Sequence, residues 1–123
     1  MIKLIIAGGR DFADYELLKF EVKKFIIEEI KTKKDLHVIS GTCWGADKLG
    51  EQFAAEYNFP VIPFPAKWND FGKKAGMLRN AQMAEYAEGG YCILFWDGES
   101  RGTKNMIENA ARYGLKTRII KYQ

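Results

Sequence analysis

Four short stretches of this sequence combine glycine with hydroxyl, arginine or tryptophan residues. They are residues 8–10, 40–45, 65–72 and 97–103. Glycine lets the backbone approach a ligand closely, and a guanidinium group offers a fork that fits phosphate or carboxylate. Hydroxyl groups donate hydrogen bonds, and the flat face of a tryptophan suits a stacked base. Together these residue types predict a site for a phosphate, a sugar and a base.

The stretch from Ser40 to Asp47 joins an apolar run to a helical pattern. A helix that begins at such a turn leaves free backbone N–H groups and the positive end of its dipole, which suit an anion. Simpler roles fit the same residues. Gly41 and Gly45 suit a tight turn, Thr42 suits a helix N-cap, and Asp47 also suits a favourable charge in the first helical turn.

Other side chains in these regions also have two interpretations. Trp68 lies in a loop, where we favour ligand contact, whereas Trp96 ends an apolar strand and suits the core. Arg79 fits an anion contact or a surface ion pair equally well. Cys43 stands near a helix start, which lowers a thiol pKa, but His37 belongs to a strand and no other base accompanies it. We therefore interpret Cys43 as a small turn residue.

Five apolar runs alternate with helical patterns along the chain. The strands are predicted over residues 3–7, 36–39, 61–64, 91–96 and 116–120. The helices are predicted from Asp11 or Asp14 to Ile30, from about Ala46 to Tyr57, around residues 75–86 and around residues 106–111. The strands are continuously apolar, as expected for a parallel sheet that is covered on both faces.

This alternation predicts a single α/β domain over residues 1–123. We expect a Rossmann-like three-layer sandwich, with a five-stranded parallel sheet and helices on both faces. Ligands of such folds bind beyond the carboxyl ends of the strands, at the point where the strand order reverses. The glycine-rich stretches all follow predicted strands, so they should meet at that edge. No Walker motif and no Gly-x-Gly-x-x-Gly occurs, which argues against a standard nucleotide triphosphatase or dinucleotide site.

The composition of the 123 residues is ordinary for a globular protein, with 47% hydrophobic residues and a net charge of +3. This charge permits an anionic ligand without demanding nucleic acid. The two cysteines form no metal-binding spacing, so we predict no metal and no cofactor. Few cysteines, no signal peptide and no membrane-length apolar run favour a cytoplasmic protein without a membrane partner.

The sequence resembles the YspA-like family of the SLOG superfamily. The motifs that carry the resemblance are Gly8-Gly9-Arg10-Asp11-Phe12, the stretch from Ser40 to Asp47, Phe64-Pro65-Ala66-Lys67-Trp68, the segment from Gly72 to Met83 with its Ala-Gly-x-x-Arg-Asn-x-x-Met pattern, and Ser100-Arg101-Gly102-Thr103. The resemblance implies a Rossmann-like fold and a nucleotide-related ligand. Members look like ligand-binding or sensor domains, often in bacterial and phage conflict systems.

The same superfamily includes the LOG-type phosphoribohydrolases, which cleave nucleoside monophosphates. Laid on this sequence, their arginine and methionine fall on Arg79 and Met83, and their Gly-Thr pair falls on Gly102-Thr103. Their catalytic glutamate falls on Met106, which cannot do the work of a carboxylate. This departure argues against that hydrolase activity but leaves the anion site intact. The carboxylates considered as substitutes are Asp11, Asp47, Asp97 and Glu99.

Our first hypothesis is therefore a module that binds a nucleotide or a nucleotide-derived molecule. The residues assigned to its site are Gly8, Gly9, Arg10, Ser40, Gly41, Thr42, Trp44, Gly45, Asp47, Trp68, Arg79, Asn80, Ser100, Gly102 and Thr103. The alternatives are an N-glycosidic hydrolase with a relocated carboxylate and, less favoured, a single-strand nucleic-acid binder that uses Lys67, Lys73, Lys74 and Arg79. Met77, Met83 and Tyr86 predict a helix face for homo-oligomers.

Overall fold

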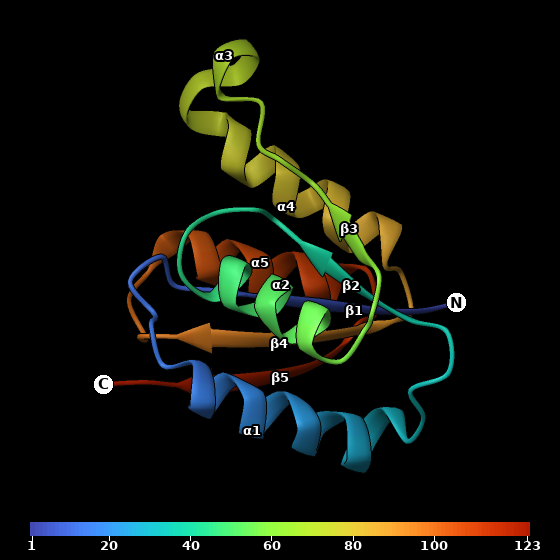
Figure 1. The fold of residues 1–123 in the computed structure, drawn as a ribbon. Coiled ribbons are helices and arrows are strands. Elements are labelled where there is room, and N and C mark those ends of the chain that lie inside the picture. The colour runs from blue at the N-terminus through green and yellow to red at the C-terminus, as the bar shows by residue number, and fades with distance from the viewer.

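A five-stranded, entirely parallel sheet forms the centre of the computed structural model, which describes residues 1–123 (Figure 1). The strands are β1 (Ile2–Gly8), β2 (Leu36–Ser40), β3 (Val61–Pro63), β4 (Tyr91–Trp96) and β5 (Lys116–Lys121). Their spatial order is β3-β2-β1-β4-β5, so β1 lies between β2 and β4. The predicted α/β sandwich with a five-stranded parallel sheet is confirmed.

Helices cover both faces of this sheet. They are α1 (Tyr15–Phe25), the π-helical turn η1 (Ile26–Ile30), α2 (Ala46–Glu56), the four-residue α3 (Trp68–Phe71), the 3-10 turn η2 (Gly72–Lys74), α4 (Ala75–Tyr86) and α5 (Arg101–Arg112). Helices α1 and α2 pack on one face, and α4 and α5 pack together on the other. In Figure 1, α3 and the start of α4 project beyond the sheet.

The continuous apolar character of the strands follows from this double cover. Along β1, Leu4 and Ile6 belong to the core under α1 and α2, whereas Ile5 and Ala7 belong to the core under α4 and α5. Successive side chains of a strand point to opposite faces, so both sets must be apolar when both faces are covered. Two apolar layers thus hold the helices against one sheet.

The local structure differs from the sequence prediction at a few places. Residues 65–72 were predicted as a loop, but they contain α3 and lead into η2. Phe64 lies just beyond β3. Of the two cap candidates, Asp14 is the residue whose side chain caps α1, since it accepts a hydrogen bond from the Leu17 N–H at 3.0 Å. The predicted first helix does extend to Ile30, but its last turn is π-helical.

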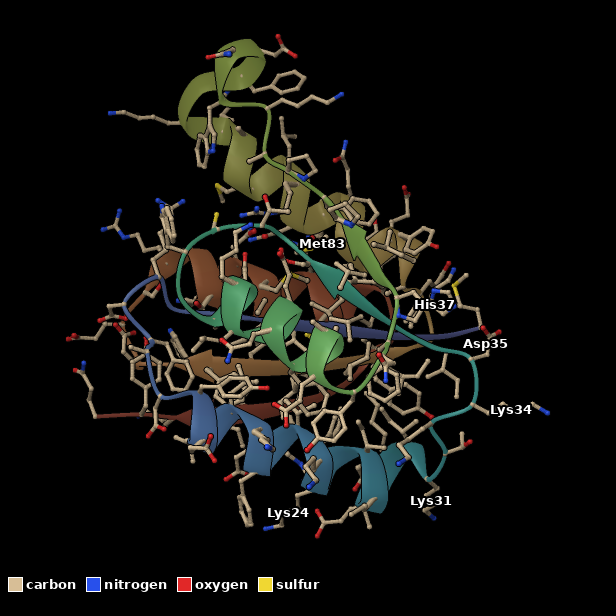
Figure 2. The ribbon with its side chains drawn as sticks, viewed as in Figure 1. Lys24, Lys31, Lys34, Asp35, His37 and Met83 are labelled. Carbon is tan, nitrogen blue, oxygen red and sulfur yellow. The ribbon has the colours of Figure 1, made fainter.

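The amino ends of the strands carry solvent-exposed polar residues. Lys31 and Lys34 follow η1, and Figure 2 shows both side chains pointing outward. His37 lies on β2 with its Nε2 atom 3.0 Å from Asp35 Oδ1.

Met83 of α4 is buried in the core under α4 and α5, so it does not face outward. Its burial reduces the exposed helix face that was predicted for homo-oligomers. None of the helices has the length and apolar character needed to span a membrane.

Candidate functional site

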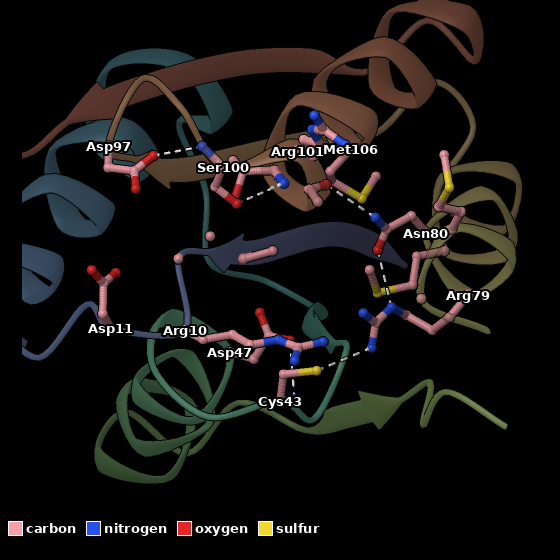
Figure 3. Close-up of a pocket in the computed structure, with 18 of the residues that line it drawn as sticks. Arg10, Asp11, Cys43, Asp47, Arg79, Asn80, Asp97, Ser100, Arg101 and Met106 are labelled. Atoms are coloured by element: carbon pink, nitrogen blue, oxygen red, sulfur yellow. Dashed lines mark hydrogen bonds between the residues drawn. The ribbon is translucent and has the colours of Figure 1, made fainter. Parts of the chain in front are cut away.

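A cavity of about 700 Å³ opens at the carboxyl edge of the sheet (Figure 3). Residues that follow β1 and β4 line it, together with residues from the starts of α4 and α5. Strands β1 and β4 are neighbours, and the helices that follow them cover opposite faces. The cavity therefore lies at the switch point of the strand order, where open α/β sheets bind ligands.

The cavity brings together most, but not all, of the residues assigned from the sequence. Those that line it are Gly8, Gly9, Arg10, Asp47, Trp68, Arg79, Asn80, Ser100, Gly102 and Thr103. Those assigned but absent from its lining are Ser40, Gly41, Thr42, Trp44 and Gly45. Further lining residues that were not assigned to this site are Ala7, Asp11, Cys43, Lys73, Gly76, Met77, Met83, Asp97, Arg101 and Met106.

The turn between β4 and α5 presents open backbone donors to the cavity. Asp97 Oδ1 accepts hydrogen bonds from the N–H groups of residues 99 and 100, each at 2.8 Å, and Trp96 Nε1 donates to the Ser100 carbonyl at 3.1 Å. The Ser100 hydroxyl caps the Thr103 N–H. The N–H groups of Arg101 and Gly102 have no partner in the protein. This helix start can therefore receive an anion.

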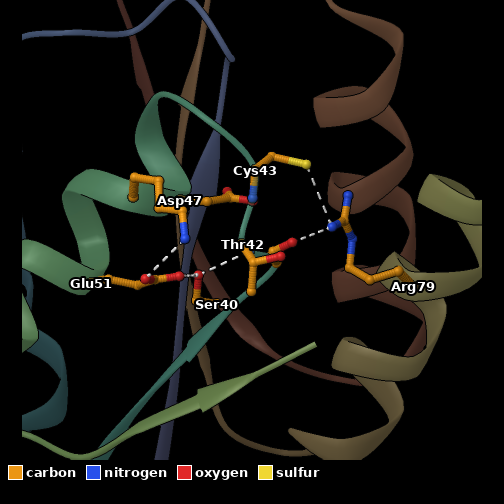
Figure 4. Close-up of polar contacts among 8 residues, drawn as sticks. Ser40, Thr42, Cys43, Asp47, Glu51 and Arg79 are labelled. Carbon is orange, nitrogen blue, oxygen red and sulfur yellow. Dashed lines mark hydrogen bonds and ion pairs between the residues drawn. The ribbon is translucent and has the colours of Figure 1, made fainter. Parts of the chain in front are cut away.

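The turn between β2 and α2 uses three of its backbone donors within the protein (Figure 4). The Thr42 N–H donates to Ser40 Oγ at 3.0 Å, and the Cys43 N–H donates to Asp47 Oδ2 at 3.1 Å. The Ala46 N–H donates to the Gly9 carbonyl at 3.1 Å. Thr42 is not the N-cap of α2, because Gly45 occupies that position without a side-chain bond. The Asp47 carboxylate already stands at this helix start.

Two glycines allow this turn to pack closely. Gly45 has φ +81°, and an added Cβ would lie 2.3 Å from the carbonyl oxygen of Gly9. An added Cβ at Gly41 would lie 2.8 Å from Asp47 Oδ2 and 2.9 Å from Arg79 Nη1. Neither position tolerates a larger residue without movement of its neighbours. Because Gly41 has no side chain, the Asp47 carboxylate and the Arg79 guanidinium can both pack against its backbone.

Arg79 is buried in the wall of the cavity, with 7% of its surface exposed. Its Nη1 atom donates to the Gly41 carbonyl and lies 3.7 Å from Cys43 Sγ, and its Nε atom donates to Asn80 Oδ1 at 3.0 Å. No ion pair includes Arg79, so the surface ion-pair interpretation is wrong. The third nitrogen, Nη2, makes no hydrogen bond. Every fully buried polar side-chain atom of the protein has a partner, so Nη2 is accessible, and it faces the cavity that Arg79 lines.

Asn80 links this arginine to the open helix start. Its Nδ2 atom donates to the Gly102 carbonyl at 3.2 Å and to Asn105 Oδ1 at 3.0 Å. The same side chain accepts from Arg79 through Oδ1. The amide thus holds the start of α4 against the start of α5. The two cationic features of the cavity, the guanidinium and the helix start, are positioned together.

Asp47 is the second buried charged residue of the cavity, with 5% of its surface exposed. Burial raises its pKa to about 6, although the Cys43 N–H and the charge of Arg79 oppose this rise and Glu51 adds to it. The pKa therefore lies near neutrality. Figure 3 shows Asp47 and Cys43 on the opposite side of the cavity from Asp97 and Ser100.

The three tryptophans have different surroundings. Trp68 is 45% exposed and lines the cavity, and the Arg10 guanidinium lies 5.6 Å from its ring centre. Trp44 is 79% exposed and does not line the cavity. Trp96 is half-buried and fastens the turn before α5, as described above. Trp68 is therefore the tryptophan placed to cover a ligand.

The position that the resemblance assigns to a catalytic glutamate lies in the cavity wall. Met106 is buried there, so an apolar thioether occupies that place. Of the four substitute carboxylates, Asp11, Asp47 and Asp97 line the cavity and Glu99 does not. No group of three or more His, Cys, Asp or Glu side chains is arranged to hold a metal ion.

The basic residues proposed for nucleic acid differ in their exposure. Lys67, Lys73 and Lys74 are exposed around α3 and η2. Arg79 is buried in the wall of the cavity, which Lys73 also lines. Binding of single-stranded nucleic acid by these residues stays a prediction.

Comparison with known proteins identifies the family. The model of the YspA, cpYpsA-related SLOG family matches residues 2–71, which include the motifs at residues 8–12, 40–47 and 64–68. The chain is also 31% identical over 121 residues to the Gene 61 protein of Mycobacterium phage D29, covering 94% of this chain and 93% of that protein. No solved structure matched significantly. This chain belongs to the YspA, cpYpsA-related SLOG family, as the motifs predicted.

Proposed function

We propose that this protein binds a nucleotide or a nucleotide-derived phosphorylated molecule in the cavity at the switch point, as a sensor or a sequestering domain. The observation that carries the proposal is the buried Arg79, which has no carboxylate partner and directs Nη2 into the cavity. Asp47 is a nearby opposite charge, but no ion pair joins it to Arg79, and a buried guanidinium without an ion pair is costly for a fold. A bound anion would supply the ion-pair partner.

Three features support a phosphorylated ligand. The free N–H groups of Arg101 and Gly102 offer donors beside the positive end of the α5 dipole. Arg79 offers the free N–H groups of Nη2 to a phosphate oxygen. Trp68 offers a ring for a base. The cavity volume of about 700 Å³ is in the range of small-molecule sites.

A screen of thermal stability tests this function. The protein is mixed with nucleotides, nicotinamide adenine dinucleotide derivatives and cyclic dinucleotides, and each mixture is then analysed by mass spectrometry. A ligand at a thousand times its dissociation constant adds about 4 kcal/mol and raises the melting temperature by several degrees. A shift with the ligand recovered intact supports binding. No shift with any member of the panel contradicts the proposal for these ligands.

Asp47 favours a second candidate function, the hydrolysis of an N-glycosidic bond. It is the buried carboxylate of the cavity, and its pKa of about 6 suits a general base near neutral pH. Asp47 would take a proton from water as the water oxygen bonds the anomeric carbon. The carbon–nitrogen bond would break, and the base nitrogen would receive a proton. Free base in the mass analysis, and its loss in Asp47→Ala, would support hydrolysis.

A further inference from the structure

Three carboxylates line the cavity, and Asp47 differs from the other two. Asp11 is exposed and accepts a hydrogen bond from the Tyr122 hydroxyl at 2.6 Å. Asp97 is half-buried and caps the turn before α5 through Oδ1. Asp47 is buried, yet only its Oδ2 atom accepts a hydrogen bond, from the Cys43 N–H. Within the protein, the Oδ1 atom of Asp47 therefore has no hydrogen-bond partner.

The second oxygen of Asp47 faces the cavity. Oδ1 accepts no hydrogen bond, and none of the ion pairs of the molecule includes Asp47. No fully buried polar side-chain atom lacks a partner, so this unpaired oxygen reaches the cavity surface. Asp47 and Arg79 approach each other on the two sides of Gly41, where a Cβ would contact both. An acceptor and a donor thus stand side by side in the cavity wall.

The chemistry of these two groups constrains what fills the cavity. An ionised carboxylate only accepts hydrogen bonds, and so does a phosphate dianion, so the phosphate of a ligand must avoid Asp47. A phosphate held by Arg79 and the α5 start leaves Asp47 for another part of the ligand. That part must donate a hydrogen bond, because a buried carboxylate that loses water without gaining a donor is strongly unfavourable.

We propose that Asp47 is a specificity-determining residue that accepts hydrogen bonds from the ribose hydroxyl groups of the ligand. The cavity thereby selects a phosphorylated ribose over its 2-deoxy analogue and over inorganic phosphate. This inference rests on the proposed function, since it concerns the same cavity. It adds the part of the ligand that lies next to the phosphate, and it assigns that part to a carboxylate whose second oxygen has no hydrogen-bond partner in the protein.

Calorimetric titration with three probes tests the inference. The probes are ribose 5-phosphate, 2-deoxyribose 5-phosphate and inorganic phosphate, each added to the full chain at pH 8, where Asp47 is ionised. We expect ribose 5-phosphate to bind about tenfold to a hundredfold more tightly than its deoxy analogue, because a hydrogen bond to a charged acceptor is lost. Inorganic phosphate should bind more weakly than ribose 5-phosphate.

The Asp47→Asn variant assigns any discrimination to this carboxylate. The amide oxygen still accepts from the Cys43 N–H, so the variant keeps the turn. The ratio between the two sugar phosphates should fall to about threefold or less. Glu99→Gln makes the same change of charge outside the cavity lining and should keep the ratio of the wild type.

The results distinguish a failure of this inference from a failure of the proposed function. Equal binding of the two sugar phosphates by the wild type, or an unchanged ratio in Asp47→Asn, would overturn the inference and leave the phosphate site standing. Failure of every phosphorylated probe to bind would overturn the proposed function for such ligands and the inference with it. A ratio that falls in Asp47→Asn and persists in Glu99→Gln would establish the role of Asp47.

Discussion

The β2–α2 turn and the β4–α5 turn leave the same edge of the sheet, but only the first leads into a helix with a buried carboxylate, Asp47, in its first turn. In the first turn, the N–H groups of Thr42, Cys43 and Ala46 bond to groups of the protein. In the second, the N–H groups of Arg101 and Gly102 remain free beside the cavity. The N–H groups of Asp47 and Lys48 at the α2 start are also free, but the Asp47 carboxylate beside them disfavours an anion. The second turn is therefore the one that offers its donors to an anionic ligand.

This contrast shows that a glycine-rich turn before a helix is not by itself an anion site. The carboxylate of Asp47 occupies the start of α2, where an external anion would otherwise bind. The start of α5 has only the Ser100 cap, and an added Cβ at Gly102 would meet nothing within 4 Å. Four predictions test the difference, beginning with the largest expected effect.

The Gly45→Ala variant should be severely destabilised. Its Cβ would lie 2.3 Å from the Gly9 carbonyl oxygen, and its φ of +81° is strained for any residue with a side chain. Strain and overpacking together should lower the free energy of unfolding by about 3 kcal/mol or more. Urea denaturation measures the loss. Gly102→Ala, in open space, should change it by less than about 1 kcal/mol. Equal losses of unfolding free energy in Gly45→Ala and Gly102→Ala would mean that the two turns do not differ in how closely they are packed.

The Arg79→Met variant should lose most of the affinity for a phosphorylated ligand. Loss of a charge-assisted bond should weaken binding by about 1.5–3 kcal/mol, which calorimetry can measure. The variant also leaves the Gly41 carbonyl without its donor, so its folding must be checked by circular dichroism. Arg79→Lys keeps the charge but loses the fork. Arg112→Met, on the exposed end of α5, should bind like the wild type.

Asp47→Asn should stabilise the protein at alkaline pH. Burial raises the folded-state pKa of Asp47 from 3.8 to about 6, so the wild type loses stability as the pH rises through this window. At pH 8 the variant should unfold with a free energy about 2 kcal/mol higher, and near pH 4 the two proteins should be alike. Urea denaturation at both values measures this. A variant that is less stable at pH 8 would mean that the carboxylate stabilises the turn.

Trp44→Ser should have the smallest effect. The side chain is 79% exposed and does not line the cavity, although it lies in the first turn and was assigned to the site. Stability should change by about 0.5 kcal/mol or less, and ligand affinity should stay constant. Trp68→Ser is the matched variant inside the cavity lining, and there we expect weaker binding of a nucleotide. If Trp44→Ser weakened ligand binding more than Trp68→Ser, Trp44 would belong to the site.

Local patterns predicted the fold well because they repeat along the chain. Apolar runs that end at glycine, such as residues 3–7 before Gly8-Gly9, indicated strands that are covered on both faces. The cap at Asp14 follows from local chemistry as well. The helix α3 escaped prediction because its four residues have no apolar period, and none of them is buried.

The site was predicted less completely, because its residues depend on contacts between distant segments. Arg79 was a candidate anion contact from its residue type and Asn80 entered with the family motif, but the hydrogen bond that holds Arg79 in the cavity wall goes to Gly41, which is 38 residues away. Trp44 and Trp68 both lie in glycine-containing stretches that follow predicted strands, yet only Trp68 lines the cavity. Asp11 and Asp97 were considered only as substitute carboxylates, and the structure places both in the cavity lining.

The sequence by itself determined the alternation of strands and helices, the edge at which the glycine-rich turns gather, and the family. These properties follow from residue periodicity and from motifs, both of which are local. Only the tertiary structure decided which residues line the cavity and which buried charges form no ion pair. The physical reason is that hydrogen-bond satisfaction and desolvation depend on what packs against a group, and at Asp47 and Arg79 those neighbours come from α2, the β2–α2 turn and α4.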